Sequence, residues 1–530
     1  MKRIALLFSV LSLTLAPVLA EEGAKPEGAK PPEGSEEVFK PEEVVTSGSA
    51  AGVDYQAVAG TLIVHPRGWD DVKDKENKEN PTAVASMFYV GYFKKGAAAA
   101  ARPVTFFYNG GPGSSTVWLH MGAYGPKRIV TADDTHTPAA PYPLVDNAST
   151  LLDATDLVFI DAPGTGFSRI AGKDKEKAFF GVDADAYAFE QFIQKFLSKH
   201  GRWNSPKFLF GESYGTPRSA VLVNLLETQA SIDFNGVILL SQILNFDLSA
   251  DGAEANPGVD LPYQVVLPTY AATAWYHHKL PGDRPADLPK FLAEVEKFAM
   301  TDYALALLAG AALPVDRRAA VAEKLHQYTG LPVAYILKAN LRIQGGEFEK
   351  NLQDDANLTT GRLDSRFSGP TIDPLSKEAD YDPQSSAISS AYVSSFNEYV
   401  RKSLNYGHDR QFKPFIDAWT KWEFKHQQPG MPFALPGATN VLPDLAMAMK
   451  VNPGLKVLVL GGYFDLATPY FEGVYEMQHL PIPASLQGNI SYRYYQSGHM
   501  VYANEQALKQ SHDDVAAFIH ANANLPAEKK

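Results

Sequence analysis

Cysteine is absent from the 530 residues of this chain. Its absence excludes disulfides, a cysteine nucleophile, a thiolate metal site and a thioether-linked lipid anchor. A chain of this length can bury a sufficient core without cross-links. The charge balance is acidic, with 48 Lys and Arg against 60 Asp and Glu, and no long basic run occurs. This balance argues against a general role in binding nucleic acid.

Long apolar runs are also missing, except at the N-terminus. Lys2 and Arg3 precede the apolar stretch IALLFSVLSLTLAPVL, and Ala20 offers a small residue for cleavage. The stretch is shorter than the roughly 20 residues that cross a bilayer, and it contains Pro17, so residues 1–20 are predicted to be a signal peptide rather than an anchor. An exported chain without cysteine indicates a bacterial periplasmic or secreted protein with no stable membrane insertion.

The segment that follows is rich in Glu, Lys, Pro and Gly and partly repeats itself, as in EEGAKPEGAKPPEGSEE. Such a composition cannot bury apolar surface. Residues 21–50 are therefore expected to form a disordered acidic leader.

Strand-like and helix-like patterns alternate over residues 51–250. Two antiparallel strands are expected at YQAVAGTLIV and ASMFYVGYF, and further strands end in the glycine-rich turns of FFYNGGPG and VFIDAPGTG. Residues 183–200 have helical spacing, with a predicted buried face of Tyr187, Phe189, Phe192, Ile193, Phe196 and Leu197. The alternation predicts an α/β fold with a mostly parallel sheet covered on both faces.

The alternation stops over residues 251–434. Helical patterns there, including DRRAAVAEKLHQYTG and AISSAYVSSFNEYVRKSL, predict a large, mainly helical insertion, or lid. The sheet pattern resumes over residues 435–530 with LKVLVLGGYFD and ISYRYYQSGHM. The closing helix is expected to bury Leu508, Val515, Ala516 and Ile519.

One serine has the surroundings of a nucleophile. Ser213 lies in FLFGESYGTP, between an apolar strand and a predicted helix, and Gly211 and Gly215 leave room for a sharp turn. Such a strand–turn–helix lifts the hydroxyl above the edge of the sheet. An ordinary glycine-bounded turn would look similar, so a base and an acid are also required.

His499 and Asp465 are the candidates for these roles. Each follows a predicted strand, in YYQSGHM and VLVLGGYFDLATP respectively. A single histidine is more often structural, and an aspartate after a strand is often only a helix cap. The order Ser213, Asp465, His499 is nevertheless that of α/β-hydrolases, which favours catalysis. The N–H of Tyr214, directly after the serine, would supply one oxyanion donor, and the loop in FFYNGGPGSS would supply the other.

Several motifs together resemble one family. YNGGPGSS, DAPGTGFS, GESYG, GGYFDLATP and SGHM occur in the order found in serine carboxypeptidases, from about Tyr55 to the closing helix. The resemblance implies an α/β-hydrolase fold with the insertion between the nucleophile and the Asp and His strands. It also implies a triad of Ser213, Asp465 and His499, with Gly111 and Tyr214 as the oxyanion donors.

The same family removes C-terminal residues and recognises the free α-carboxylate of its peptide substrate. Asn109, Gly110 and Glu212 match the positions that bind this carboxylate. Two carboxylates in contact must share a proton, so the pKa of the pair should rise and acidic pH should favour cleavage. The sequence departs from the family where Ala123 replaces a second carboxyl and Ser114 replaces a cysteine. DAPGTGFS is expected to shape the floor of the site, without a catalytic role for Asp161 or Ser168.

Other readings of the same residues lead to different functions. An aminopeptidase or esterase of the same superfamily would use the same triad, and a protein that has lost catalysis would only bind its ligand. No H-E-x-x-H motif is present and the paired His of YHHKL need not share a ligand, so no metal and no cofactor are expected. The expected partners are peptide substrates.

Overall fold

The computed structural model describes residues 38–71 and 80–525. The predicted signal peptide and most of the predicted leader lie outside these residues, as does most of the charged turn between the first two expected strands. Residues 39–530 form one compact unit. No helix among the described residues is both long enough and apolar enough to cross a membrane.

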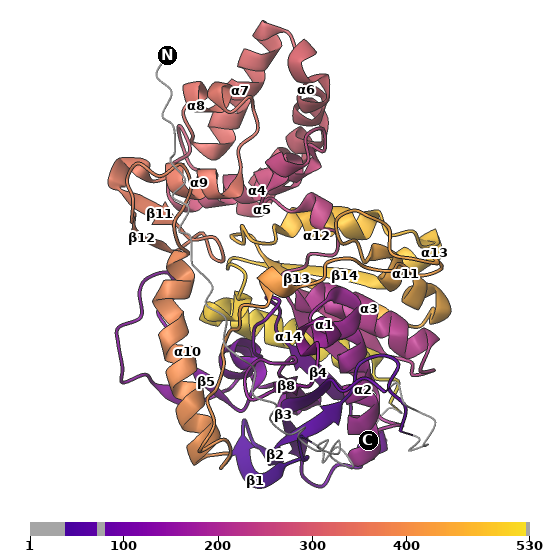
Figure 1. The fold of residues 1–530 in the computed structure, drawn as a ribbon. Coiled ribbons are helices and arrows are strands. Elements are labelled where there is room, and N and C mark those ends of the chain that lie inside the picture. Colours follow the sequence, from indigo (N-terminus) through magenta and orange to yellow (C-terminus); the bar gives the residue numbers. More distant parts are fainter. Residues whose placement is uncertain (1–37, 72–79, 526–530) are drawn as a thin grey trace, which may run out of the picture. The chain divides into compact units, whose positions relative to one another are not determined.

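A ten-stranded sheet forms the centre of this unit (Figure 1). The pairs β7–β4, β4–β9, β9–β10, β10–β13 and β13–β14 are parallel, whereas β1–β2, β2–β3, β3–β7 and β3–β8 are antiparallel. The sheet is mostly parallel, and β7 lies between β3 and β4, so the spatial order of these strands differs from their order in the chain. This is the sheet of an α/β-hydrolase, as predicted. In spatial order the strands are β1 (Glu43–Ala50), β2 (Val53–Val64), β3 (Val84–Lys94), β7 (Asp156–Ile160), β4 (Val104–Tyr108), β9 (Lys207–Glu212), β10 (Gly236–Leu240), β13 (Lys456–Gly462) and β14 (Ile490–Tyr495), with β8 (Arg169–Ala171) beside β3.

The first strand corrects one prediction. Residues 43–50 are not part of a disordered leader, because they form β1 and pair with β2 from Glu43↔Gly60 to Ala50↔Val53. Side chains of β1 are largely exposed or half-buried. The strand is therefore held mainly by its backbone pairing, which composition does not reveal.

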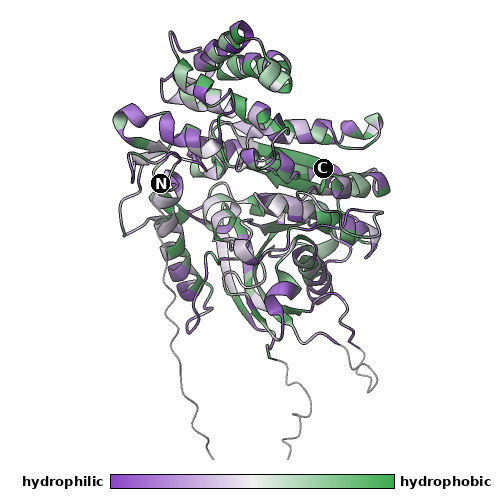
Figure 2. Cartoon of the chain, turned by 45° about the horizontal axis from the view of Figure 1, so that its top comes forward, coloured by the Kyte–Doolittle hydropathy of each residue, from purple (hydrophilic) through white to green (hydrophobic). Residues whose placement is uncertain are grey.

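Helices cover both faces of the sheet, as a parallel sheet requires. Side chains of α2, α3 and α11 share one buried cluster with Phe106 of β4, whereas α10 and α14 share another with Phe107. Figure 2 shows hydrophobic residues concentrated in the strands and on the inner sides of these helices. The helices of the core are α1 (Lys175–Phe179), α2 (Val182–Lys199), α3 (Gly215–Thr228), α11 (Leu442–Val451), α12 (Tyr470–Gln478), α13 (Ala484–Gln487) and α14 (Glu505–Asn522).

The predicted helix faces agree closely with the burial. The four residues predicted to be buried in the closing helix are all buried in α14. In α2, five of the six predicted residues are buried and Tyr187 is only half-buried. Tyr187 lies instead beneath the guanidinium of Arg67, 5.4 Å from its ring centroid.

The insertion between β10 and β13 is mainly helical and has its own hydrophobic cluster. Its helices form a group separate from the sheet, apart from the long α10 (Figure 1). The elements are α4 (Leu261–Tyr276), α5 (Leu288–Phe298), α6 (Ala304–Ala309), α7 (Val315–Thr329), α8 (Val333–Lys338), α9 (Gly345–Asn351) and α10 (Pro383–Lys402), with the short pair β11 (Leu358–Thr360) and β12 (Ser368–Pro370).

Two smaller features complete the path around the site. The hairpin of β5 (Lys127–Ile129) and β6 (Leu144–Asp146) follows the first glycine-rich loop. After α10, the chain returns along the core and makes isolated bridges from Lys413 to Gly166 and from Phe415 to Ser114. This returning segment brings Phe415 to the glycine-rich loop after β4.

Candidate active site

Ser213 occupies a sharp turn between β9 and α3. Its backbone has the left-handed φ of +59°, and its N–H donates to the carbonyl of Leu240 over 2.9 Å. The turn is too tight for side chains on either side, because a Cβ on Gly211 would meet the Ser219 Oγ at 2.5 Å. The local geometry is that of a nucleophile elbow, in which a strained serine stands above the sheet edge.

His499 and Asp465 meet in a buried ion pair. His499 follows β14 and Asp465 follows β13, and the His499 Nδ1 lies 2.8 Å from the Asp465 Oδ2. Burial lowers the pKa of His499 but the charge of Asp465 raises it further, so the net pKa lies above the ordinary value. A proton on Nδ1 leaves Nε2 as the acceptor that a general base needs.

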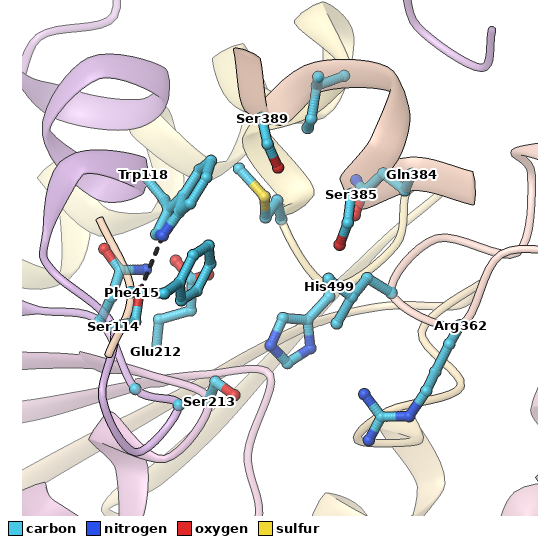
Figure 3. Close-up of a pocket in the computed structure, with 16 residues that line it drawn as sticks. Ser114, Trp118, Glu212, Ser213, Arg362, Gln384, Ser385, Ser389, Phe415 and His499 are labelled. Carbon is cyan, nitrogen blue, oxygen red and sulfur yellow. Dashed lines mark hydrogen bonds between the residues drawn. The ribbon is translucent and has the colours of Figure 1, made fainter. Parts of the chain in front are cut away.

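Ser213 and His499 line one cavity of about 170 Å³. Figure 3 shows Glu212 close to Ser213, with Trp118, Ser114 and Phe415 on the same side of the pocket. Gln384, Ser385 and Ser389 of the insertion lie on the other side. The structure therefore brings two of the predicted catalytic residues into one pocket and joins the third to the histidine. The size of the cavity suits a single amino-acid side chain beside the serine.

Of the two predicted oxyanion donors, Gly111 lines this cavity, and Tyr214 directly follows Ser213, which also lines it. Gly111 belongs to the loop after β4 and has a φ of +108°, and Tyr214 stands at the N-terminus of α3. A Cβ on the neighbouring Gly110 would come within 2.8 Å of both the Glu212 carbonyl oxygen and the Tyr214 Cα, so the two loops touch. Within the described part of the chain, neither the Gly111 nor the Tyr214 N–H has a hydrogen-bond acceptor. Such donors are free to bind a developing oxyanion.

A buried ion pair supports this loop from below. Arg218 of α3 donates to the Asp185 Oδ2 over 2.5 Å and to the carbonyl of Asn109 over 2.8 Å. Its guanidinium also lies 5.5 Å from the centroid of the Tyr214 ring. One residue thus connects α2, the glycine-rich loop and the residue after the nucleophile, which fixes the spacing of the oxyanion donors.

Glu212 carries the most unusual carboxyl of the site. It is 3% exposed, and its Oε2 accepts a hydrogen bond from the Tyr502 hydroxyl over 2.8 Å. The Oδ1 of Asn109 accepts from the Leu119 N–H, and the Asn109 side chain lies near enough to Glu212 to lower the pKa of its carboxyl. Burial raises the pKa of Glu212 to about 7, despite the opposing effects of His499, Tyr502 and Asn109. Glu212 can therefore carry a proton near neutral pH.

A second carboxyl is missing from the pocket, as Ala123 suggests. Ala123 is fully buried in the turn between the glycine-rich loop and β5. Among the described residues that line the cavity, Glu212 is the only acid. Glu212 is thus the one acid of this lining that could share a proton with a substrate carboxylate.

Asp161 and Ser168 have structural roles. The Asp161 Oδ1 accepts from the Thr116 N–H over 2.8 Å, and the Ser168 hydroxyl donates to the Asp161 carbonyl over 2.9 Å. Neither residue lines the cavity. They hold the loop that carries Thr116 against the end of β7.

Several residues in or beside the pocket were not found from the sequence. Tyr502, which donates to Glu212, stands three positions after His499, close enough to the SGHM motif to be a candidate by proximity alone. Arg362, Gln384 and Ser389 come from the insertion, where no motif identifies them. Arg362 is held by Asp251, whose Oδ2 lies 3.1 Å from the Arg362 Nε.

A short piece of the insertion fixes the loops that carry His499 and Asp465. The His499 N–H donates to the Leu363 carbonyl over 2.6 Å, and the Leu466 N–H donates to the Arg362 carbonyl over 3.0 Å. The Gly498 N–H donates to the Asp364 Oδ2, which also pairs with Arg366. The insertion is therefore part of the frame that orients the imidazole.

Replacing Gly498 with alanine should disturb this frame. A Cβ at Gly498 would lie 2.5 Å from the Cα and Cγ of Asp364, so the loop must shift and move His499. A displacement of about 1 Å costs roughly 10²-fold in rate, so kcat should fall by about that factor. Gly488→Ala is the matched control, because nothing lies within 4 Å of its Cβ and no activity should be lost. Equal kcat values for both variants would contradict the proposed role of this contact.

No metal centre is apparent in residues 38–71 and 80–525, where no group of three or more His, Cys, Asp or Glu side chains could hold an ion.

Comparison with known proteins supports the family resemblance over part of the chain. The profile of the family described as serine carboxypeptidase matches residues 77–253. This segment contains the glycine-rich loop, DAPGTGFS and the Ser213 turn. No curated protein matches the sequence.

Solved structures with a related fold are distant in sequence. A proline iminopeptidase from Mycobacterium smegmatis is 11% identical, with 90% of this chain and 98% of that chain covered and a TM-score of 0.33. A peroxisomal α/β-hydrolase from Saccharomyces cerevisiae is 11% identical, with 93% and 94% covered and a TM-score of 0.33. An epoxide hydrolase mutant from Aspergillus niger is 13% identical, with 87% and 78% covered and a TM-score of 0.31. The strand order above therefore carries the fold assignment. The resemblance to serine carboxypeptidases is confirmed over residues 77–253, and this match supports a serine hydrolase.

Proposed function

We propose that this protein is a serine-type carboxypeptidase that releases C-terminal amino acids from peptides and favours acidic to neutral pH. The Ser213 hydroxyl attacks the carbonyl of the last peptide bond, while His499 takes the hydroxyl proton and Asp465 stabilises the resulting imidazolium. The N–H groups of Gly111 and Tyr214 bind the oxyanion. The histidine then gives its proton to the leaving amine, and water hydrolyses the acyl-enzyme.

The observation that carries this proposal is the buried, protonatable carboxyl of Glu212 beside Ser213. A protonated Glu212 can donate to the free α-carboxylate of a substrate, which Asn109 and the Gly110 N–H also bind. Burial of an ionisable carboxyl beside the nucleophile is unfavourable and needs a reason. A group placed next to the nucleophile and able to share a proton with a carboxylate provides one.

The direct test uses peptides that differ only at their ends. Mass spectrometry should show a free peptide shortened stepwise from its C-terminus, whereas the same peptide with a C-terminal amide should stay intact. N-terminal acetylation should have no effect. Loss of activity on the acetylated peptide would indicate an aminopeptidase, and cleavage of small esters alone would indicate an esterase. The predicted signal peptide over residues 1–20 leads us to propose that the substrates are met outside the cytoplasm.

The pH dependence tests the role of Glu212 separately. Below pH 7 the carboxyl is protonated and can bind a carboxylate; above pH 7 it ionises and repels one. The value of kcat/KM should therefore fall about tenfold per pH unit above 7. At acidic pH it should also fall, because His499, with its raised pKa, becomes protonated and cannot act as a base. The measurement is kcat/KM between pH 5 and 9 on one short peptide.

Glu212→Gln should remove the alkaline fall and keep the acidic one. The matched control is Glu227→Gln, because burial also raises the pKa of Glu227 to about 7 but this residue does not line the pocket. The control should keep both limbs of the profile. An alkaline fall that survives in Glu212→Gln would contradict the assignment.

A further inference from the structure

One face of α10 forms a wall of the active-site cavity. Gln384, Ser385, Ile388 and Ser389 all line it, a spacing that places them on neighbouring turns of one helix side. Figure 3 shows Gln384, Ser385 and Ser389 across the pocket from Trp118 and Phe415. The cavity thus has polar side chains of α10 on one side and the rings of Trp118 and Phe415 on the other.

Gln384 is the unusual member of this wall. The residue is 0% exposed, and neither its Oε1 nor its Nε2 has a hydrogen-bond partner among the described residues. A buried amide without partners is unfavourable, and native proteins rarely leave one so. Because Gln384 borders the cavity, a rotation of its side chain would bring the amide to a molecule in the cavity, which can then supply the missing partners.

The position of α10 relative to Glu212 shows which part of a substrate would meet this wall. Tyr392, farther along α10, is buried and lies near enough to Glu212 for the glutamate charge to raise the pKa of its phenol, after the larger effect of burial. In the proposed function, Glu212 binds the α-carboxylate of the leaving residue. The side chain of that residue is attached to the same carbon, so it must occupy the rest of this cavity, next to α10.

We propose that Gln384 makes this enzyme selective for leaving residues with a primary amide side chain, asparagine or glutamine. The inference rests on the proposed carboxypeptidase function and adds a substrate class to it. The amide of Gln384 presents one acceptor oxygen and two donor hydrogens, which complement a second primary amide in the opposite orientation. The hydroxyls of Ser385 and Ser389 can complete the remaining hydrogen bonds. Trp118, Ile388 and Phe415 contact the methylene part of the side chain.

The test compares peptides that end in residues of similar shape. One pair ends in asparagine or leucine and the other in glutamine or methionine, with all preceding residues identical. Each pair competes in one reaction with the full-length enzyme, and mass spectrometry follows the release of each terminal residue. A site built around hydrogen bonds discriminates strongly against a shape analogue that lacks them. We expect the amide member of at least one pair to be released about tenfold faster or more.

The Gln384→Met variant should abolish or reverse this preference, measured as the ratio of the two release rates within each pair. Methionine has nearly the same volume as glutamine and fits an apolar core, so the helix should stay in place. Gln506→Met is the control, because Gln506 lies outside this cavity and its variant should keep the wild-type preference. The ratio of release rates measured with the wild-type enzyme tests the inference even if a variant fails to fold.

Two results would overturn the inference. Equal release of both members of each pair by the wild type would show that water, not substrate, satisfies the Gln384 amide. A preference for amides that persists in Gln384→Met would place the selectivity elsewhere. Both results are distinct from failure of the proposed function, in which no C-terminal residue would be released from any of the four peptides.

Discussion

Replacing Ser213 with alanine is expected to lower kcat for peptide hydrolysis by on the order of 10⁶-fold, because removal of the nucleophile ends covalent catalysis. The fold should survive the change. The turn at Ser213 is held by backbone hydrogen bonds. The Ser213 N–H donates to the Leu240 carbonyl, and the Ser213 carbonyl accepts from the Thr216 N–H. Alanine keeps both bonds. The measurements are the rate of peptide cleavage, labelling by a fluorophosphonate probe and the melting temperature.

A matched variant separates catalysis from backbone strain. Ser231 also has a left-handed φ, of +55°, but it does not line the pocket. Ser231→Ala should keep full activity and full labelling. If Ser213→Ala were still labelled by the probe at the wild-type rate, another residue would be the nucleophile and the proposed mechanism would fail. Labelling of the wild type would also exclude a protein that only binds its ligand.

The sequence predicted the parts of the site that lie at strand ends. Ser213, Asp465 and His499 each follow an apolar run that is broken by glycine, and parallel strands end at one edge of a sheet. Neighbouring parallel strands are therefore expected to bring such residues together. The structure pairs β9 with β10, β10 with β13 and β13 with β14, so the three residues follow three strands, β9, β13 and β14, that lie within a group of four neighbours. Local pattern and global topology agree here.

The insertion's share of the site could not be predicted in the same way. Helical periodicity in AISSAYVSSFNEYVRKSL, residues 387–404, predicts most of α10 but not which of its turns reaches the pocket. Gln384 and Ser389 look like ordinary residues at a helix start. Similarly, nothing in GRLDSRFSG indicates that Leu363 and Asp364 bind the loop of His499. These contacts depend on the placement of the insertion against the core, which no short sequence pattern encodes.

The β1 strand shows a related limit. Its sequence, EVVTSGSA, has few large apolar residues and follows a leader that composition marks as unstructured. The strand forms because β2 offers a free edge for backbone pairing. An edge strand of this kind is specified by its partner more than by its own side chains.

Replacing Asp465 with asparagine is expected to lower kcat by about 10⁴-fold while it preserves the structure around the site. The Asp465 Oδ1 accepts from the N–H groups of Ala467 and Thr468, at 2.9 and 3.0 Å, so the oxygen of asparagine must take this place. The new NH₂ group then replaces Oδ2, which lies 2.8 Å from the His499 Nδ1 and 2.7 Å from the Thr468 hydroxyl.

This arrangement gives the imidazole the wrong tautomer. The asparagine NH₂ donates to Nδ1, so the proton of neutral His499 moves to Nε2, which can no longer accept the proton of Ser213. The loss should therefore appear in kcat and in the rate of fluorophosphonate labelling, with the melting temperature nearly unchanged. Asp444→Asn is the matched control, because Asp444 forms a second buried pair with a histidine, His426, outside the pocket. The activity of this control per folded molecule should equal that of the wild type. Full activity in Asp465→Asn would mean that His499 does not depend on Asp465 for its tautomer, and the proton path through Nε2 would have to be abandoned.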